Sequence, residues 1–180
     1  MAGIHLILGG ARSGKSRFAE QDVRKAVEIS GSPAIYIATA TAEDDEMRSR
    51  IDRHAESRQS DSVEWITLEE PTCLGRAILS QIEQPVVLVD CLTLWLSNCL
   101  QKNCWIQERE ALFNALETWE LSGNHGRLVF VSNETGLGVV PMGQLSREFV
   151  DQSGFLHQDI ASKADRVTLV VAGLPTQLKP

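Results

Sequence analysis

The stretch from Ile4 to Ser16 reads IHLILGGARSGKS, and it decides the fold class of this chain. Residues 4–8 are mostly apolar and have the length of a strand. Residues 9–16 match the pattern G-x-x-x-x-G-K-[ST] in full, and a helical stretch is expected directly afterwards, over 15–30. A strand, a glycine-rich loop and a helix in this order predict a phosphate-binding loop, or P-loop.

The chemistry of the P-loop follows from its residue types. Glycines allow a tight turn whose backbone N–H groups converge on phosphate oxygens. The helix that follows adds its free amides and the positive end of its dipole. We expect Lys15 to reach the β- and γ-phosphates and to be catalytic, and Ser16 to bind Mg²⁺. The predicted nucleotide contacts in the loop are Gly9, Gly10, Ala11, Arg12, Ser13, Gly14, Lys15 and Ser16.

Strand-like and helix-like segments alternate along the rest of the chain. Further strands are expected at 34–38, 63–67, 86–90, 128–132 and 167–171, and further helices at 43–58, 71–83, 91–102, 106–121 and 142–164. This alternation predicts an α/β fold of the P-loop NTPase type, with a mainly parallel sheet and helices on both faces. Because no repeat or linker interrupts it, residues 1–180 are expected to form one nucleotide-binding domain.

Composition excludes several classes of partner. The net charge is −7, so a broad surface for nucleic acid is not expected. The apolar runs have strand length, far below the roughly 20 residues of a membrane span. Four cysteines occur without a C-x-x-C pair, which indicates reduced thiols in a cytoplasmic protein and no cysteine metal site.

Asp90 ends the most apolar of the expected strands, and two roles for it are open. It could hold Mg²⁺, directly or through water, as the second acidic group of a P-loop site. It could also be the N-cap of the helix that starts near Cys91. Thr93 and Asn98, just beyond, are expected to be packed and hydrogen-bonded only.

A second strand end also carries polar residues. Glu134 and the loop 135–141 follow the expected strand at 128–132, where ligands bind in open α/β sheets. The two glycines of this loop allow either close approach to a ligand or only a tight turn. The base-recognition motif N-K-x-D is absent, which argues against a switch GTPase.

The four histidines differ in their surroundings. His54 stands in the polar stretch RIDRHAESR at 50–58 and is either a surface residue or a nucleophile. Its helix would begin near the nucleotide if strand 34–38 runs parallel to strand 4–8. His5 is expected in the core or at an edge of the sheet, His125 in a turn, and His157 either lining a site or facing water.

Several motifs together resemble the bifunctional adenosylcobinamide kinase / adenosylcobinamide-phosphate guanylyltransferase family of cobalamin biosynthesis. Beside the P-loop GGARSGKS they are YIAT at 36–39, DDEM at 44–47 and R-I-x-x-H at 50–54. The segments VDCLTLWLSN at 89–98, VSNETGLGVVP at 131–141 and ADRVTLVVAGLP at 164–175 fit as well. The resemblance spans nearly the whole chain, in order.

The resemblance implies two reactions at one nucleotide site. A hydroxyl of adenosylcobinamide takes a phosphoryl group from ATP or GTP, and GTP then donates GMP to the adenosylcobinamide phosphate, with Mg²⁺ bound beside the nucleotide. It implies that GMP passes through His54, whose neutral imidazole is a good nucleophile near pH 7. It also implies a homotrimer. The GTP contacts that it implies are Thr39, Ala40, Thr41, Ala55, Glu56, Ser57, Arg58, Glu69 and Asp90.

Two other functions stay open at this point. One is a single-function small-molecule kinase in which His54 is a bystander. The other is a nucleotide-gated binding module that hydrolyses or only senses its nucleotide. His54 in its R-I-x-x-H setting is the feature that separates these from the bifunctional enzyme.

Overall fold

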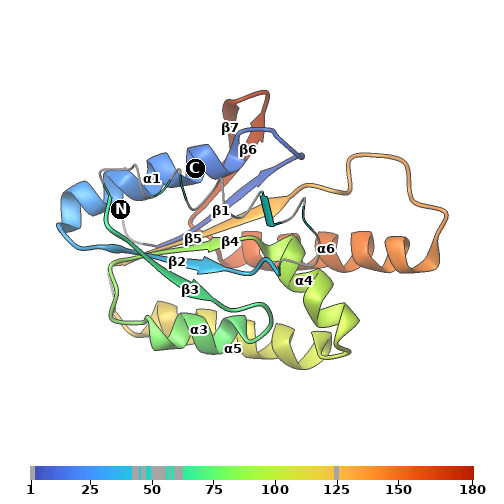
Figure 1. Ribbon diagram of the computed structural model, residues 1–180, viewed down its shortest axis with the longest axis horizontal. Coiled ribbons are helices and arrows are strands. Elements are labelled where there is room, and N and C mark those ends of the chain that lie inside the picture. The colour runs from blue at the N-terminus through green and yellow to red at the C-terminus, as the bar shows by residue number, and fades with distance from the viewer. Residues whose placement is uncertain are drawn as a thin grey trace.

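A computed structural model describes residues 3–41, 45, 48–49, 56, 58, 63–123 and 126–180. Its described strands form one sheet in the order β3-β2-β4-β5-β1-β6-β7 (Figure 1). The strands are β1 Gly3–Gly9, β2 Ala34–Ala38, β3 Trp65–Glu69, β4 Val86–Asp90, β5 Arg127–Asn133, β6 Arg166–Val171 and β7 Leu174–Lys179. The helices are α1 Lys15–Ser30, α3 Leu74–Ser80, α4 Leu92–Gln101, α5 Trp105–Leu121 and α6 Gln144–Lys163.

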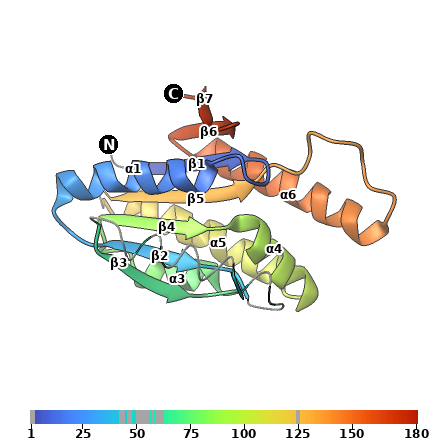
Figure 2. The ribbon, with the colours of Figure 1, turned by 45° about the horizontal axis from the view of Figure 1, so that its top comes forward.

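Helices cover both faces of the sheet, as predicted. Figure 2 shows α1 on one face and α3, α4, α5 and α6 on the other. Along β4, Val86 and Leu88 pack in the cluster that contains α1 residues, whereas Val87 and Val89 pack in the cluster that contains the other helices. Residues 86–89 of β4 are therefore all apolar, because this part of the strand is buried on both faces.

The prediction of a mainly parallel sheet is confirmed. Strands β1 to β6 pair in parallel, and only β6 and β7 pair antiparallel. The strand at 167–171 is the last one predicted from the sequence, but a further strand, β7, follows it. Ala172 and Gly173, with φ of 51° and 79°, form the two-residue connection to β7. A positive φ at both positions suits this tight hairpin, but alanine rarely supplies it, so the sequence signal is weak.

Most of the other boundaries differ from the predictions by one or two residues, and for two elements the structure shows the reason. The strand expected at 63–67 begins at Trp65, because its pairing with β2 sets Trp65 against Ala34 and Glu69 against Ala38. The helix expected at 71–83 is shorter and begins at Leu74. Before it, the carboxylate of Glu70 accepts hydrogen bonds from two backbone N–H groups, which closes a turn.

The helix expected at 43–58 lies mostly outside the described residues. The described positions within it are helical: Asp45, Arg48, Ser49, Glu56 and Arg58. No helix of the described part is long and apolar enough to cross a membrane.

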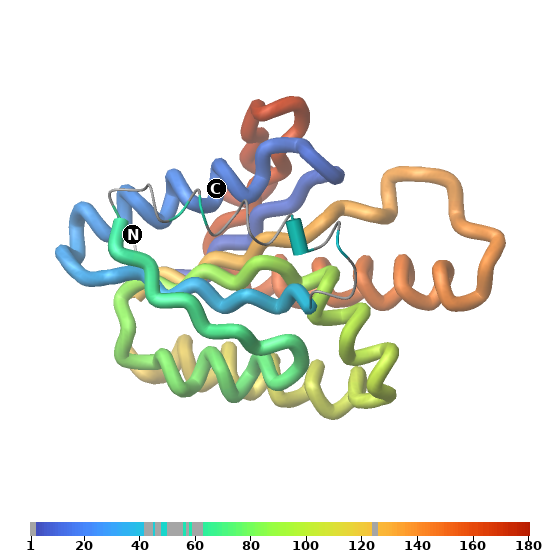
Figure 3. The backbone as a smooth tube through the Cα atoms, viewed as in Figure 1, coloured from blue at the N-terminus to red at the C-terminus, as the bar shows by residue number. Residues whose placement is uncertain are grey.

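Parallel pairing brings the carboxyl ends of β1 to β6 to one side of the sheet, which we call the carboxyl edge. Ligands of open parallel sheets bind at this edge. Residues 134–143 leave it as an extended segment, which we call the arm, before α6 begins (orange in Figure 3). The arm carries strongly exposed apolar side chains, among them Leu137, Val139 and Met142.

Candidate nucleotide site at the carboxyl edge

The P-loop needs its glycines for steric reasons. A Cβ on Gly9 would lie 2.4 Å from Ser13 Oγ and 2.6 Å from the carbonyl oxygen of Val170. Gly14 has a φ of 93°, which L side chains rarely adopt. In contrast, a Cβ on Gly10 would meet no atom within 4 Å, so the loop is open at that point. The loop is therefore closely packed against β6 and open beside Gly10.

The β6–β7 hairpin supports the P-loop from behind, a contact that sequence reasoning missed. The backbone N–H of Gly173 donates a hydrogen bond to the carbonyl of Ser13 at 2.8 Å. A Cβ on Gly14 would lie 3.2 Å from Gly173 Cα. The only sequence signal was the segment AGLP at 172–175, in which Gly173 permits the positive φ.

Lys15 and Ser16 open helix α1 at the carboxyl edge. Lys15 is 9% exposed, and its Nζ donates a hydrogen bond to the carbonyl of Gly10 at 3.2 Å. Ser16 is half-buried. Ser13 Oγ is buried and has no hydrogen-bond partner among the described residues. The Lys15 ammonium group and the buried Ser13 hydroxyl thus both lie at the P-loop, where a bound phosphate would accept hydrogen bonds from them.

Asp90 ends β4 at the same edge and is half-buried. The alternative that Asp90 caps helix α4 is wrong, since the N-cap position is Cys91 and no side chain caps the helix there. Tyr36 instead donates its hydroxyl to Asp90 Oδ2 at 3.2 Å. The Ser16 hydroxyl and the Asp90 carboxylate are hard oxygen donors of the kind that Mg²⁺ prefers, so these residues fit the ion.

A buried polar network, which we call the edge network, holds the strand ends together beneath the site. Thr39 is fully buried; its Oγ1 accepts from the Cys91 N–H at 2.8 Å and donates to the Cys91 carbonyl at 2.7 Å. Asn98 donates to the carbonyl of Thr39, and Asn133 donates to Thr93 Oγ1 at 3.0 Å. The prediction that Thr93 and Asn98 are packed and hydrogen-bonded is confirmed.

The end of β5 touches the P-loop directly. The N–H of Glu134 donates to the carbonyl of Gly9 at 3.0 Å. The carboxylate of Glu134 accepts from the N–H of Gly136 at 2.6 Å, so Gly136 belongs to a tight turn. Glu134 thus borders the nucleotide loop, in agreement with its predicted place at a strand end.

Three further residues predicted to contact GTP lie at or just after the ends of strands β2 and β3, away from the P-loop strand β1. Ala40 and Thr41 are half-buried after β2, and Glu69 is exposed at the end of the outer strand β3. Strand β3 is four positions from β1 in the sheet, or about 19 Å at the usual strand spacing. These residues share an edge with the P-loop, but β2 and β3 are three and four positions away from β1 in the sheet.

The polar segment with the expected nucleophile is only partly described. His54, Ala55 and Ser57 lie outside the described residues, as does His125. Glu56 is exposed, whereas Arg58 is only 8% exposed. The guanidinium carbon of Arg58 lies 3.7 Å from the centre of the Tyr36 ring, a cation–π contact. Arg58 therefore lies one side chain away from Asp90, with Tyr36 between them.

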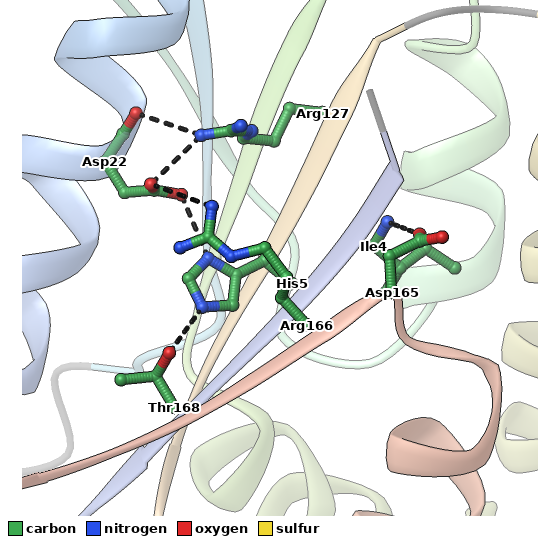
Figure 4. A network of polar contacts seen from close by, with 7 residues as sticks. All are labelled: Ile4, His5, Asp22, Arg127, Asp165, Arg166 and Thr168. Atoms are coloured by element: carbon green, nitrogen blue, oxygen red, sulfur yellow. Dashed lines mark hydrogen bonds and ion pairs between the residues drawn. The ribbon is translucent and has the colours of Figure 1, made fainter. Parts of the chain in front are cut away.

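A second polar cluster, the His5–Asp22 network, lies between α1 and the sheet, away from the carboxyl edge (Figure 4). His5 is in the core, one of the two places predicted for it, and lies 2.9 Å from both Asp22 Oδ2 and Thr168 Oγ1. Since the carboxylate only accepts, His5 Nδ1 carries the proton. Arg127 Nη1 lies 3.0 Å from Asp22 Oδ1 and Arg166 Nη1 lies 3.7 Å from it.

These contacts set the charge state of Asp22. Burial alone raises the pKa of Asp22, but the hydrogen bond from His5 and the charges of Arg127, His5 and Arg166 outweigh it, and the pKa is lowered. Elsewhere, His157 does not face water: it is 7% exposed and lies 2.7 Å from Ser132 Oγ. Burial lowers the pKa of His157, which favours the neutral ring.

Comparison with known proteins shows one family that matches the sequence of this chain. The family described as "Cobinamide kinase / cobinamide phosphate guanyltransferase" matches residues 5–178. The bifunctional adenosylcobalamin biosynthesis protein CobP of Pseudomonas aeruginosa is 54% identical, with 97% of this chain and 96% of that protein covered. CobU proteins described as bifunctional adenosylcobalamin biosynthesis proteins are 37% identical in Escherichia coli and 33% in Salmonella typhimurium, covering 97% of this chain and 98% of theirs.

A solved structure is similar at much lower sequence identity. The KaiC-like protein of Pyrococcus horikoshii superposes with a TM-score of 0.48 at 17% identity, over 93% of this chain and 70% of its own. The sequence relatives, in contrast, match over almost their full lengths. The chain belongs to the cobinamide kinase / cobinamide phosphate guanyltransferase family.

Proposed function

We propose that this chain is a bifunctional enzyme of cobalamin biosynthesis that works as one domain. It phosphorylates adenosylcobinamide with ATP or GTP, and it then transfers GMP from GTP to adenosylcobinamide phosphate, giving adenosylcobinamide-GDP and pyrophosphate. The observation that carries this proposal is a P-loop with Lys15 and Ser16 at the same sheet edge as Asp90, in a chain 54% identical to a bifunctional adenosylcobalamin biosynthesis protein.

In the kinase step, the P-loop residues position the nucleotide and stabilise charge. The loop amides and Lys15 would hold the β- and γ-phosphates, and the γ-phosphorus–oxygen bond to the nucleoside diphosphate breaks as the substrate hydroxyl bonds to phosphorus. Ser16 and Asp90 would hold Mg²⁺, which neutralises phosphate charge. The open space beside Gly10 leaves room for the phosphates.

In the guanylyl step, a ring nitrogen of His54 would attack the α-phosphorus of GTP. The nitrogen–phosphorus bond forms as the bond to the bridging oxygen breaks, and pyrophosphate leaves with that electron pair. The phosphate of the corrinoid then attacks the same phosphorus and releases His54. The support is the setting of His54 in R-I-x-x-H and the position of Arg58, four residues further along the chain, beside Tyr36 and Asp90.

The nucleotide would extend along the carboxyl edge from the P-loop toward β2 and β3. The order β3-β2-β4-β5-β1 puts Ala40, Thr41 and Glu69 on the side of the sheet away from the phosphates. These residues, with Ala55, Glu56 and Ser57, would therefore contact the guanosine end, whereas Arg58, beside Tyr36 and Asp90, would meet a phosphate. Thr39 already uses its hydroxyl, N–H and carbonyl in the edge network, so it would shape this end.

We also propose that the enzyme is a cytoplasmic homotrimer. The arm and the start of α6 expose five apolar side chains, each at least 66% exposed: Leu137, Val139, Val140, Met142 and Leu145. Large apolar side chains exposed together along one segment are typical of a protein interface. All four cysteines are unpaired, as a reducing compartment would keep them. The molar mass in solution, by light scattering, tests the trimer.

Labelled GTP tests the guanylyl step. With GTP labelled at the α-phosphate, we expect a covalent label that is stable in alkali and lost in acid, as a phosphoramidate is. GTP labelled at the γ-phosphate should give none. His54→Ala should abolish the label while preserving phosphorylation of adenosylcobinamide, and the control His125→Ala should keep both.

The same assay separates the alternatives. A single-function kinase would phosphorylate adenosylcobinamide but take no α-label. A binding module would do neither, while still binding nucleotide. Either result with the wild-type protein would refute the bifunctional assignment.

A further inference from the structure

We propose that Tyr36 is a positioning residue for both reactions: its hydroxyl orients the carboxylate of Asp90, and its ring anchors Arg58. The proposal rests on the proposed function, since it concerns the metal-binding carboxylate and the segment that carries His54. No part of the P-loop motif includes Tyr36, which lies in the middle of β2.

The sheet register explains how Tyr36 reaches Asp90. Asp90 lies directly opposite Ala38, and Tyr36 is two residues earlier, opposite Leu88. Tyr36 and Asp90 therefore share one sheet face on a diagonal, a separation that a long aromatic side chain can cross. The Tyr36 hydroxyl lies 3.2 Å from Asp90 Oδ2, and the residue is only 5% exposed.

This hydrogen bond is the kind that fixes a metal ligand. The terminal torsion of aspartate has a broad energy profile, so a carboxylate at a strand end needs a partner to hold its plane. The phenol hydroxyl donates to Oδ2, while Oδ1 accepts no hydrogen bond from a described residue.

The face of the same ring holds Arg58. Its guanidinium carbon lies 3.7 Å from the ring centre, and Trp65 meets the ring edge-on at 6.0 Å between centroids. Arg58 is only 8% exposed, yet its Nη1 has no hydrogen-bond partner among the described residues. A buried cation with an unused donor is costly unless an anion meets it, and a nucleotide phosphate is such an anion.

Tyr36 therefore connects two groups with different tasks. On one side is the carboxylate expected to serve phosphoryl transfer. On the other is an arginine four residues after His54, the residue expected to carry GMP. Removing only the hydroxyl should disturb the first connection, whereas removing the ring should disturb both.

The test compares Tyr36→Phe, Tyr36→Leu and a matched control, Thr168→Val. Thr168→Val also removes a buried hydroxyl, but one in the His5–Asp22 network. Two quantities are measured: the Mg²⁺ concentration for half-maximal kinase rate, and the rate of GMP labelling from α-labelled GTP at saturating Mg²⁺. A purely structural tyrosine would alter stability without changing the Mg²⁺ dependence.

We expect Tyr36→Phe to raise the half-maximal Mg²⁺ concentration about tenfold, the lower end of effects seen when the partner of a metal ligand is removed. Its labelling rate at saturating Mg²⁺ should stay close to that of the wild type. Tyr36→Leu should show the same Mg²⁺ shift and, because Arg58 loses its ring, a labelling rate lower by about tenfold or more. Thr168→Val should leave both quantities unchanged.

The proposal is overturned if Tyr36→Phe reaches its half-maximal kinase rate at the same Mg²⁺ concentration as the wild type. It is also overturned if Thr168→Val raises that concentration as much as Tyr36→Phe does. Since leucine also leaves a cavity, thermal melting is recorded first, and the nearly isosteric Tyr36→Phe decides the question if Tyr36→Leu does not fold. Failure of the proposed function looks different. In that case the wild-type protein itself neither phosphorylates adenosylcobinamide nor takes the α-label.

Discussion

Two polar groups on the α1 face of the same sheet differ in how far their charges are matched within the protein. In the His5–Asp22 network, one carboxylate meets a histidine and two arginines, and nearly every polar atom has a partner; Arg166 Nε is the exception among the described residues. At the carboxyl edge, Ser13 Oγ and Arg58 Nη1 are buried without a described partner, and Asp90 Oδ1 accepts no hydrogen bond from a described residue.

This difference separates support from function. A buried charge that the protein itself neutralises holds elements together, here α1 with β1, β5 and β6. A polar group that the protein leaves open is costly in isolation and is expected where a ligand completes it. The following changes should therefore lower stability in the first group and activity in the second.

The largest effect is expected from Asp22→Asn. It leaves two arginines and His5 without their counter-charge in a buried site, which should lower the free energy of unfolding by about 3–5 kcal/mol. Urea unfolding measures this. The control Asp159→Asn breaks the surface ion pair with Arg109 and should cost about 1 kcal/mol or less. Equal losses in the two variants would contradict a structural role for the network.

Lys15→Ala should lower activity strongly and stability little. Loss of a preorganised positive charge at the phosphates should lower the kinase rate by about 10²–10³-fold. Melting should change far less than in Asp22→Asn, because the hydrogen bond from Lys15 Nζ to the Gly10 carbonyl lies within one loop and joins no distant segments. Steady-state rates and melting curves check both parts, with Lys163→Ala, from a surface ion pair, as the control. Full kinase activity in Lys15→Ala would contradict the P-loop assignment.

Gly173→Ala should affect both folding stability and nucleotide binding. Alanine at a φ of 79° should cost about 1–2 kcal/mol of folding stability. Because Gly173 donates to Ser13 in the P-loop, the KM for GTP should also rise. Gly31→Ala is matched to it, with a φ of 68° at the end of α1 and open space around it. Both variants should lose stability, but only Gly173→Ala should raise the KM for GTP. An equal rise in Gly31→Ala would contradict the support of the P-loop by the hairpin.

The smallest expected effect is a pH dependence that comes from Asp22. Its folded-state pKa lies below the unfolded value of about 3.9, so its contribution to stability is complete above that value. The contribution is lost as the pH falls through the folded-state pKa. One proton corresponds to a slope of at most about 1.4 kcal/mol per pH unit. Urea unfolding between pH 3 and 6, in roughly unit steps, should show a shallower slope in Asp22→Asn than in the wild type.

The predicted and observed elements agree best where one segment carries its own signal. Helix α1 and strands β2 and β4 have the predicted bounds, because apolar runs and the P-loop glycines mark them locally. Strand β3 was displaced by two residues, since its bounds depend on pairing with β2, which no local pattern encodes. Strand β7 was missed because its side chains are mostly exposed and its turn uses alanine where asparagine or aspartate is usual.

The site shows the same division. Lys15, Ser16 and Asp90 were predicted from motifs and strand ends, and the structure brings their elements to one edge. Tyr36, Gly173 and the Thr39–Cys91 hydrogen bonds were not predicted, because each depends on a contact between segments far apart in the chain. His54 stays a prediction from its motif.

By itself, the sequence determined that the chain has a P-loop in an α/β sheet and which family its motifs resemble, because those features depend on residue type and local spacing. Only the tertiary structure decided the strand order, the hairpin behind the P-loop, and the division of buried charges into matched and open groups. Hydrogen bonds and ion pairs between distant segments depend on distances of a few ångströms, which are set when the strands pair and the helices pack.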